Sequence, residues 1–268
     1  MLDYDFMQRA LAAALVTGLV APAIGTYLVQ RRLALLGDGI GHVALTGVAL
    51  GLLTGVAPLL TAVLVAVAGS LLIEILRTHA KTSGDLALAI LFYGGIAGGV
   101  LLINLAGEGA QRLNAYLFGS ITTVSPMDLA VVAGLGSVAL ATSLFLSPQL
   151  FAVCHDEEHA RVSGVPVQLY GILIAVLAAV TITVAMRTVG LLLVSALMIV
   201  PVAAAQQLAP SFRSTHLLAM AIGLVAAVGG VVLSYQADTQ SGPTIVVVAL
   251  AVFAAFAVVR GVRAWMQK

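Results

Sequence analysis

The sequence has little charge and only one cysteine. Of its 268 residues, 12 are Lys or Arg and 11 are Asp or Glu, so only 9% are charged. A soluble domain carries about 25% charged residues, so this chain cannot cover a water-facing surface. The net charge of +1 argues against a nucleic-acid partner. The single cysteine, Cys154, excludes a disulfide within the chain and any cysteine-based cluster.

The sequence also lacks the motifs of nucleotide-hydrolysing and hydrolytic enzymes. Lys81 and Lys268 are its only lysines, and neither follows a glycine, so there is no phosphate-binding loop. There is no H-E-x-x-H, and no serine lies beside a plausible base within an apolar run. The "GDG" at 37–39 lacks the upstream glycine of an intramembrane aspartyl protease. We therefore expect a protein that is not an enzyme.

Long apolar runs dominate the chain, with 61% hydrophobic residues and a mean hydropathy of +1.13. A helix needs about 20 apolar residues to cross a bilayer. Nine runs are long enough to cross. Because the second and third are joined only by a short turn at 54–58, eight complete crossings are the alternative to nine. The sequence predicts an all-α, polytopic integral membrane helical bundle of eight to nine transmembrane helices, with 1–268 as one single transmembrane domain. The runs fall at 10–30, 33–54, 56–76, 85–105, 127–147, 167–186, 188–209, 215–235 and 243–262.

The distribution of basic residues predicts the orientation, because cytoplasmic loops are enriched in Lys and Arg. With nine spans and the N-terminus outside, only Arg9, Arg112 and Arg187 face outward. The C-terminus is then cytoplasmic. The connection 235–243 has no Lys or Arg, as expected of an outer loop. The residues predicted to face the cytoplasm are Arg31, Arg32, Arg77, Lys81, Arg161, Arg213, Arg260, Arg263 and Lys268.

Asp38 and His42 stand out within the second predicted span. Asp38 is the deepest acid in any predicted span, and a buried acid costs about 2.5–3.5 kcal/mol on insertion scales. At about 1.5 Å rise per residue, His42 lies roughly 15 Å beyond Arg32, near the predicted membrane midplane. The i, i+4 spacing places the carboxylate and the imidazole on one helix face. Both are ligands for a first-row divalent cation, and two copies of the segment supply four ligands.

The residues alone leave three interpretations of this pair open. The pair binds a transported metal ion, relays protons, or is structural, with each side chain satisfying the other. Gly37, Gly39 and Gly41 weaken the helix around it and suggest the broken helices of transporters. The stripe Gly47, Gly51 and Gly55 is instead expected to pack against a neighbouring helix.

The connection 148–166 is the second unusual feature. Its part 154–166 is predicted to form a short exposed helix with Asp156, Glu157 and Glu158 in the first turn, where acids suit the helix dipole. Gly164 is the expected C-terminal stop. The helix either docks on a cytosolic subunit or is an ordinary solvated loop. A metal site at Cys154 and the nearby histidines 155 and 159 is a weaker alternative.

Several segments together resemble the zinc/manganese/iron class of ABC importer permeases. "LLGDGIGHVALTGVALG" resembles the second-span motif of that family, and "NAYLFGSITTVSPMDL" its mid-chain segment. "DEEHARVSGVPV", "VGLLLVSALMIVPVAAAQQL" and "DTQSGPTIVV" follow in the family's order over nearly the whole chain. Gly39, Ile40 and Gly41 replace the commoner Ala-Leu-Ser, which removes a hydroxyl at position 41, and Thr46 replaces a proline.

The resemblance implies a permease of a prokaryotic cytoplasmic (inner) membrane that acts as a homodimer. It implies two cytosolic ATP-binding subunits and an extracytoplasmic metal-binding protein as partners. Asp38 and His42 would contact the metal. No cofactor would be permanently bound, and the cargo would be Zn²⁺, or Mn²⁺ or Fe²⁺, with zinc favoured by its place in the affinity order. A stand-alone proton-coupled metal transporter is the alternative. The residues that the resemblance assigns to ATPase coupling are Asp156, Glu157, Glu158, Arg161 and Gly164.

Overall fold

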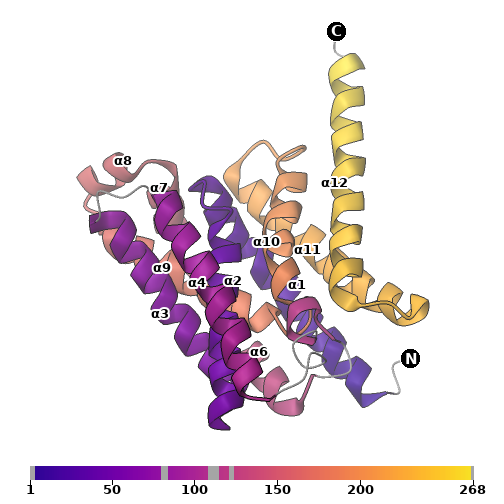
Figure 1. The fold of residues 1–268 in the computed structure, drawn as a ribbon. Coiled ribbons are helices and arrows are strands. Elements are labelled where there is room, and N and C mark those ends of the chain that lie inside the picture. The colour runs from indigo at the N-terminus through magenta and orange to yellow at the C-terminus, as the bar shows by residue number, and fades with distance from the viewer. Residues whose placement is uncertain (1–3, 80–83, 108–114, 121–123, 267–268) are drawn as a thin grey trace.

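The computed structural model describes residues 4–79, 84–107, 115–120 and 124–266, and these contain helices but no strand. The all-α prediction is confirmed. Three of the basic residues used to predict the orientation lie outside the described residues, namely Lys81, Arg112 and Lys268. The helices labelled in Figure 1 are α1 (Asp5–Gln30), α2 (Leu36–Thr54), α3 (Pro58–His79), α4 (Gly84–Leu105), α6 (Pro126–Phe145), α7 (Ser147–His155), α8 (Glu157–Val162), α9 (Val167–Ala185), α10 (Leu191–Ala205), α11 (Phe212–Ala237) and α12 (Ser241–Met266).

Local sequence signals set several helix ends. Ser125 and Asp128 form a reciprocal capping box at the start of α6, and Pro126 occupies the first helical turn. Ser211 caps α11 in the same way. Gly55 ends α2 in the left-handed conformation, with φ of 73°. These ends follow from side-chain capping and from the conformational freedom of glycine.

Eight helices, α1, α2, α3, α4, α6, α9, α11 and α12, are long and apolar enough to cross a membrane. The predicted run 188–209 is the exception, because α10 has only 15 residues. A 15-residue helix is about 22 Å long, shorter than the roughly 30 Å hydrocarbon core. α10 contains Pro201 and packs against α1, α11 and α12. It still returns the chain through the bundle, so the two termini lie at opposite ends of the molecule (Figure 1).

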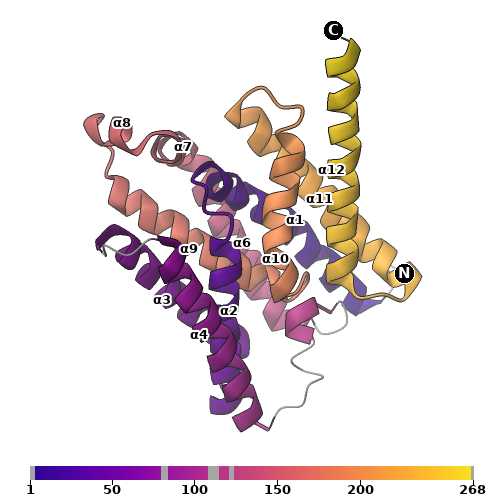
Figure 2. The ribbon, with the colours of Figure 1, turned by 45° about the horizontal axis from the view of Figure 1, so that its top comes forward.

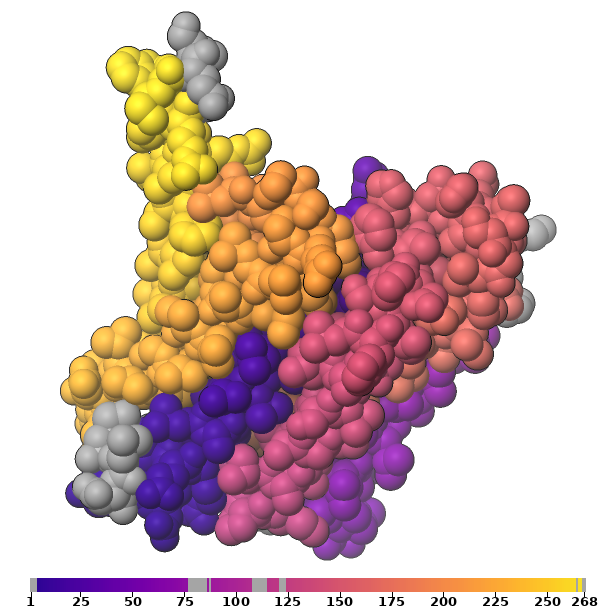
Figure 3. All heavy atoms as spheres, turned by 180° about the vertical axis from the view of Figure 1, so that it is seen from behind, coloured from indigo at the N-terminus to yellow at the C-terminus, as the bar shows by residue number. Residues whose placement is uncertain are grey.

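The helices pack as two groups around α1. In Figures 1 and 2, α3 and α4 lie on one side of the molecule and α11 and α12 on the other. Seen from behind in Figure 3, α1 runs between α11 and α6, and it contacts both. The burial of α1 and α2 contrasts with α4, α6 and α12, in which few residues are buried. The molecule therefore has a protein-enclosed centre and these three helices at its periphery.

Glycines set how closely α2 approaches its neighbours. A Cβ at Gly47 would lie 2.7 Å from Ala62 Cα in α3, and a Cβ at Gly51 would lie 2.7 Å from Pro58 Cα. The predicted packing role of these two glycines is confirmed. The prediction for Gly55 is wrong, because nothing lies within 4 Å of its added Cβ and its role is to end the helix.

Candidate functional site

Asp38 lies in the first turn of α2, and His42 follows one turn later on the same helix. α2 is continuous from Leu36 to Thr54, so the expected break at the glycines does not occur. Gly37 instead faces Ser195 in α10, and Gly39 faces Leu88 in α4. Because glycine has no side chain, α10 and α4 can approach Asp38 closely at these positions. The glycines shape the site by close packing rather than by unwinding the helix.

The Asp38 carboxylate accepts a hydrogen bond from the Ser195 hydroxyl. Sequence reasoning missed Ser195, because 157 positions separate the two residues and only the packing of α10 against α2 joins them. Ser195 supplies this hydroxyl from a neighbouring helix. A hydroxyl donor orients one carboxylate oxygen and leaves the other lone pairs available for a cation.

His42 is 9% exposed, and its buried Nδ1 has no hydrogen-bond partner among the residues that the structure describes. Its ring meets Phe92 of α4 edge-on, with ring centroids 4.4 Å apart. A Cβ at Gly95 in α4 would lie 2.7 Å from the His42 carbonyl carbon, so glycine is required for this approach. A mutually satisfied Asp38–His42 pair does not account for the unused Nδ1. A buried polar atom without a partner is unfavourable, which favours a site with a ligand.

Asp38 opens onto a hollow of about 310 Å³ between α2 and α4, which we call the α2–α4 hollow. The rest of its lining is apolar, and Tyr93 on its rim is 69% exposed. No group of three or more His, Cys, Asp or Glu side chains placed to hold a metal occurs within the described parts of the chain. One copy thus offers Asp38 at an open edge, with His42 buried one helical turn away. The residues lining the hollow are Leu35, Asp38, Leu88, Ala89, Phe92 and Tyr93.

Depth along a predicted span and burial by neighbouring helices rank the acids differently. Glu74 in α3 is 6% exposed, whereas Asp38 is only partly buried. Gly171 in α9 leaves room for the carboxylate of Glu74 and the guanidinium of Arg31, since its Cβ would lie 2.6 Å and 3.4 Å from them. The sequence did not predict the burial of Glu74, because this residue lies near the end of a predicted span. Its burial comes from neighbouring helices.

The segment predicted as one exposed helix over 154–166 is two helices, α7 and α8. Asp156 precedes α8 as its N-cap, and its carboxylate accepts a hydrogen bond of 2.9 Å from the His159 backbone N–H, which lowers the pKa of Asp156. Gly164, with φ of 82°, follows the helix end as predicted. Its N–H donates to the Arg161 carbonyl at 3.1 Å, which completes the C-terminal cap.

The side chains of α8 fall into two classes. Glu157 forms an ion pair with Arg31, whose side chain is 4% exposed at the end of α1. Glu158 and Arg161 are exposed, and Val162 is 89% exposed. The predicted coupling residues therefore include one tied to the transmembrane bundle and several that face outward.

The weaker alternative of a metal site beside Cys154 gains no support from the geometry. Cys154 is buried, and burial raises the pKa of its thiol to about 12. A metal ligand must be the thiolate, which this environment disfavours. His155 is exposed and stacks on Phe151, with ring centroids 5.4 Å apart. The segment therefore keeps a neutral thiol in its core.

Three of the segments that resemble family motifs meet at one junction at the other end of the bundle. Gly119, Gly190 and Gly242 approach one another so closely that a Cβ on Gly190 would lie 2.3 Å from the Phe118 carbonyl carbon. A Cβ on Gly242 would lie 2.0 Å from the Val189 carbonyl oxygen. Gly119 and Gly190 also have positive φ. These motifs therefore encode a backbone junction that only the folded chain brings together.

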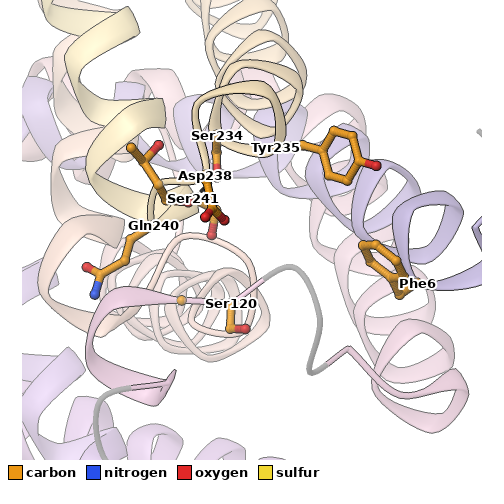
Figure 4. A pocket seen from close by; sticks show the side chains of 9 residues that line it. Phe6, Ser120, Ser234, Tyr235, Asp238, Gln240 and Ser241 are labelled. Atoms are coloured by element: carbon orange, nitrogen blue, oxygen red, sulfur yellow. Dashed lines mark hydrogen bonds between the residues drawn. The ribbon is translucent and has the colours of Figure 1, made fainter. Parts of the chain in front are cut away.

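A polar hollow of about 440 Å³ adjoins this junction, separate from Asp38. Figure 4 shows Ser120 on one side of it and Asp238 and Ser241 on the other. The Ser241 hydroxyl donates to the Thr188 carbonyl at 2.9 Å, so this side chain fixes α12 to the α9–α10 turn. Asp238 is the one acid in the lining. One carboxylate among serines and amides does not make a divalent-cation site.

Comparison with known proteins agrees with this architecture. The sequence profile of the ABC 3 transport family matches residues 3–260. The chain is 34% identical over 256 residues to the manganese transport system membrane protein MntC of Halalkalibacterium halodurans, covering 95% of this chain and 87% of the relative. It is 32% identical over 247 residues to the chelated iron transport system membrane protein YfeD of Yersinia pestis, covering 91% and 82%.

A solved structure has the same fold. PsaBC from Streptococcus pneumoniae, in complex with Fab, superposes with a TM-score of 0.86 at 31% identity, covering 94% of this chain and 91% of that chain. Family, relatives and fold agree with the resemblance of the sequence segments. The chain belongs to the ABC 3 transport family and is a multi-pass permease of an ABC-type metal importer.

Proposed function

We propose that Asp38 and His42 form half of the metal-contacting site through which this permease passes a divalent first-row cation. The observation that carries the proposal is the unused Nδ1 of His42 one turn from a carboxylate that opens onto the α2–α4 hollow. Carboxylate oxygen and imidazole nitrogen together suit Mn²⁺, Fe²⁺ and Zn²⁺. Two ligands per copy give modest affinity, which allows release of a transported ion.

A second copy of the chain supplies the other half of the site. The support is the exposed face of α4 beside Asp38, where Ile90 is 64% and Tyr93 69% exposed. A symmetric pair packed on this face brings two Asp38–His42 units together, because a two-fold interface juxtaposes the same patch from each copy. The four resulting ligands match the usual coordination number of a transition-metal site.

Separate ATP-binding subunits drive the cycle by acting on α8. The chain has no phosphate loop of its own, and α8 presents Glu158, Arg161 and Val162 outward. The ion pair between Glu157 and Arg31 joins α8 to the segment that leads into α2. A displacement of α8 thereby reaches Asp38, seven residues after Arg31. This end of the molecule is cytoplasmic in the proposed orientation, and a metal-binding protein delivers the ion at the opposite end.

The cargo that we propose is Mn²⁺ or Fe²⁺. The relatives MntC and YfeD are named for manganese and chelated iron, and a carboxylate-containing site suits these harder ions. The zinc preference expected from the affinity order stays a prediction. The proposed location is the cytoplasmic membrane of a prokaryote, with the N-terminus outside.

Uptake of manganese, iron and zinc by intact cells tests the site. Asp38→Ala and His42→Ala should each lower uptake of the physiological metal by at least about tenfold, since even outer-shell changes at metal sites cost that much. Asp5→Ala, which removes an exposed acid at the start of α1, is the control and should transport normally. Undiminished uptake by both site variants contradicts the assignment. Transport by the chain alone in liposomes, without an ATPase, supports the secondary-transporter alternative.

A further inference from the structure

A second hollow, of about 400 Å³, lies between α7 and the start of α11, far along the chain from Asp38. We call it the α7–α11 hollow. Its volume is in the range of small-molecule sites. Arg213 is exposed at its edge, and His216 is buried in its wall. The lining residues are Leu144, Ser147, Pro148, Phe151, Phe212, Arg213, His216 and Leu217.

His216 is the unusual member of this lining. It is 3% exposed, and neither ring nitrogen has a hydrogen-bond partner among the described residues. Its neighbours are aromatic, with the Tyr27 ring centroid at 5.5 Å and that of Phe212 at 5.9 Å. An imidazole carries at least one N–H donor in either protonation state. A buried donor without an acceptor is unfavourable, so an oxygen acceptor that enters the hollow and reaches this ring would stabilise its wall.

The charge of the side chains that line the α7–α11 hollow favours an anionic ligand. Arg213 precedes His216 by three residues, so both side chains lie on one face of α11. No Asp or Glu contributes to the described lining. A guanidinium and an N–H donor on one face suit a phosphate oxygen group.

The apolar residues at the rim of the hollow favour an amphiphilic ligand over a small hydrophilic one. Leu144 is 43% and Leu217 53% exposed, and Phe145 beside them is 83% exposed. These side chains connect the hollow with the outer surface of α6 and α11, two helices able to cross a membrane. A small hydrophilic phosphate would leave this rim uncovered, whereas acyl chains would cover it.

We propose that the α7–α11 hollow binds one anionic phospholipid. The phosphate lies between Arg213 and His216, and the acyl chains extend along Leu144 and Leu217. Basic sites between membrane helices recognise anionic headgroups in this way. The lipid then fills the gap between α11 and α7, whose contact is otherwise made by Phe151 and Phe212, with ring centroids 4.4 Å apart. This inference concerns a different surface from the metal site and stands independently of it.

Native mass spectrometry of the purified full-length chain with phosphatidylglycerol or phosphatidylcholine tests the proposal. The chain should bind phosphatidylglycerol several-fold more tightly, and Arg213→Gln should lower that affinity about fivefold. Arg263→Gln removes the same charge from the exposed last turn of α12, outside the hollow, and should retain binding. His216→Phe keeps an aromatic ring but removes the donor, and should also weaken binding of phosphatidylglycerol.

Three outcomes overturn the proposal. Equal binding of the two lipids excludes recognition of the headgroup charge. Equal losses in Arg213→Gln and Arg263→Gln assign the preference to overall charge rather than to this site. Displacement of phosphatidylglycerol by millimolar inorganic phosphate, with a matching rise in thermal stability from phosphate alone, shows a free-phosphate site. The Arg213 variant tests binding even if His216→Phe folds poorly, because Arg213 is exposed.

Discussion

The start of α2 and the short helix α8 both place acids and histidines within four residues, yet they differ in what lies opposite. Asp38 and His42 face Ser195 of α10 and Phe92 of α4. Around α8, the two histidines at the same spacing are exposed. The i, i+4 spacing brings two ligands to one face of α2, whereas the extended Asp156 separates His155 in α7 from His159 in α8. A neighbouring helix decides whether that face becomes an enclosed site or a solvated surface.

The largest effect is expected from separating α4 and α2. Gly95→Ala places a Cβ 2.7 Å from the backbone of His42, so one helix must move. Overpacking of this kind costs about 1–3 kcal/mol, and we expect a lower thermal midpoint together with lost metal uptake. Gly134→Ala in α6, whose Cβ would meet nothing within 4 Å, is the matched control and should keep both. Normal stability and uptake in Gly95→Ala would show that the α2–α4 approach is not needed.

The next effect separates the two classes of side chain on α8. Glu157→Lys replaces an acid paired with Arg31, whose side chain is 4% exposed, by a second cation. Placing a like charge beside a buried guanidinium is destabilising, and partial exposure of Glu157 reduces the cost to about 2 kcal/mol. Glu158→Lys changes an exposed acid beside it and should leave the thermal midpoint unchanged.

Binding of the ATPase subunit should respond to these two variants differently from the thermal midpoint. Co-purification of the ATPase subunit should fall in Glu158→Lys, because its side chain faces outward. If both variants kept ATPase binding and metal-stimulated ATP hydrolysis, α8 would be a solvated segment and not a docking helix. If only Glu157→Lys lost uptake, the Arg31 contact would be the part of α8 that matters.

The smallest effect is expected from Ser195→Ala, which removes one donor to Asp38 while leaving both metal ligands. A hydrogen bond to a charged group contributes about 1.5–3 kcal/mol, and the partial exposure of Asp38 places the loss at the lower end of that range. Uptake should therefore fall by about tenfold, below the effect of Asp38→Ala. Ser143→Ala removes a buried hydroxyl from α6 and should transport normally. Equal uptake in the two serine variants would remove Ser195 from the site.

Much of the fold follows from the sequence because a membrane protein must satisfy its backbone within each helix. Long apolar runs located the eight long helices, and Gly164 marked the end of α8. The segments that resemble family motifs also identified the permease family correctly. The run 188–209 was the weakest case, since apolar composition does not fix helix length, and α10 is short and buried among its neighbours.

The sequence by itself determined the helical class, the family, and the placement of Asp38 and His42 on one face of α2. These properties depend on composition and on residues close together in the chain. Only the tertiary structure decided that Ser195 bonds to Asp38, that Glu74 is buried and that Glu157 holds Arg31. Each of these depends on which helix faces which. Small residues such as Gly95 control that choice through contacts far apart in sequence, which periodicity along one helix does not encode.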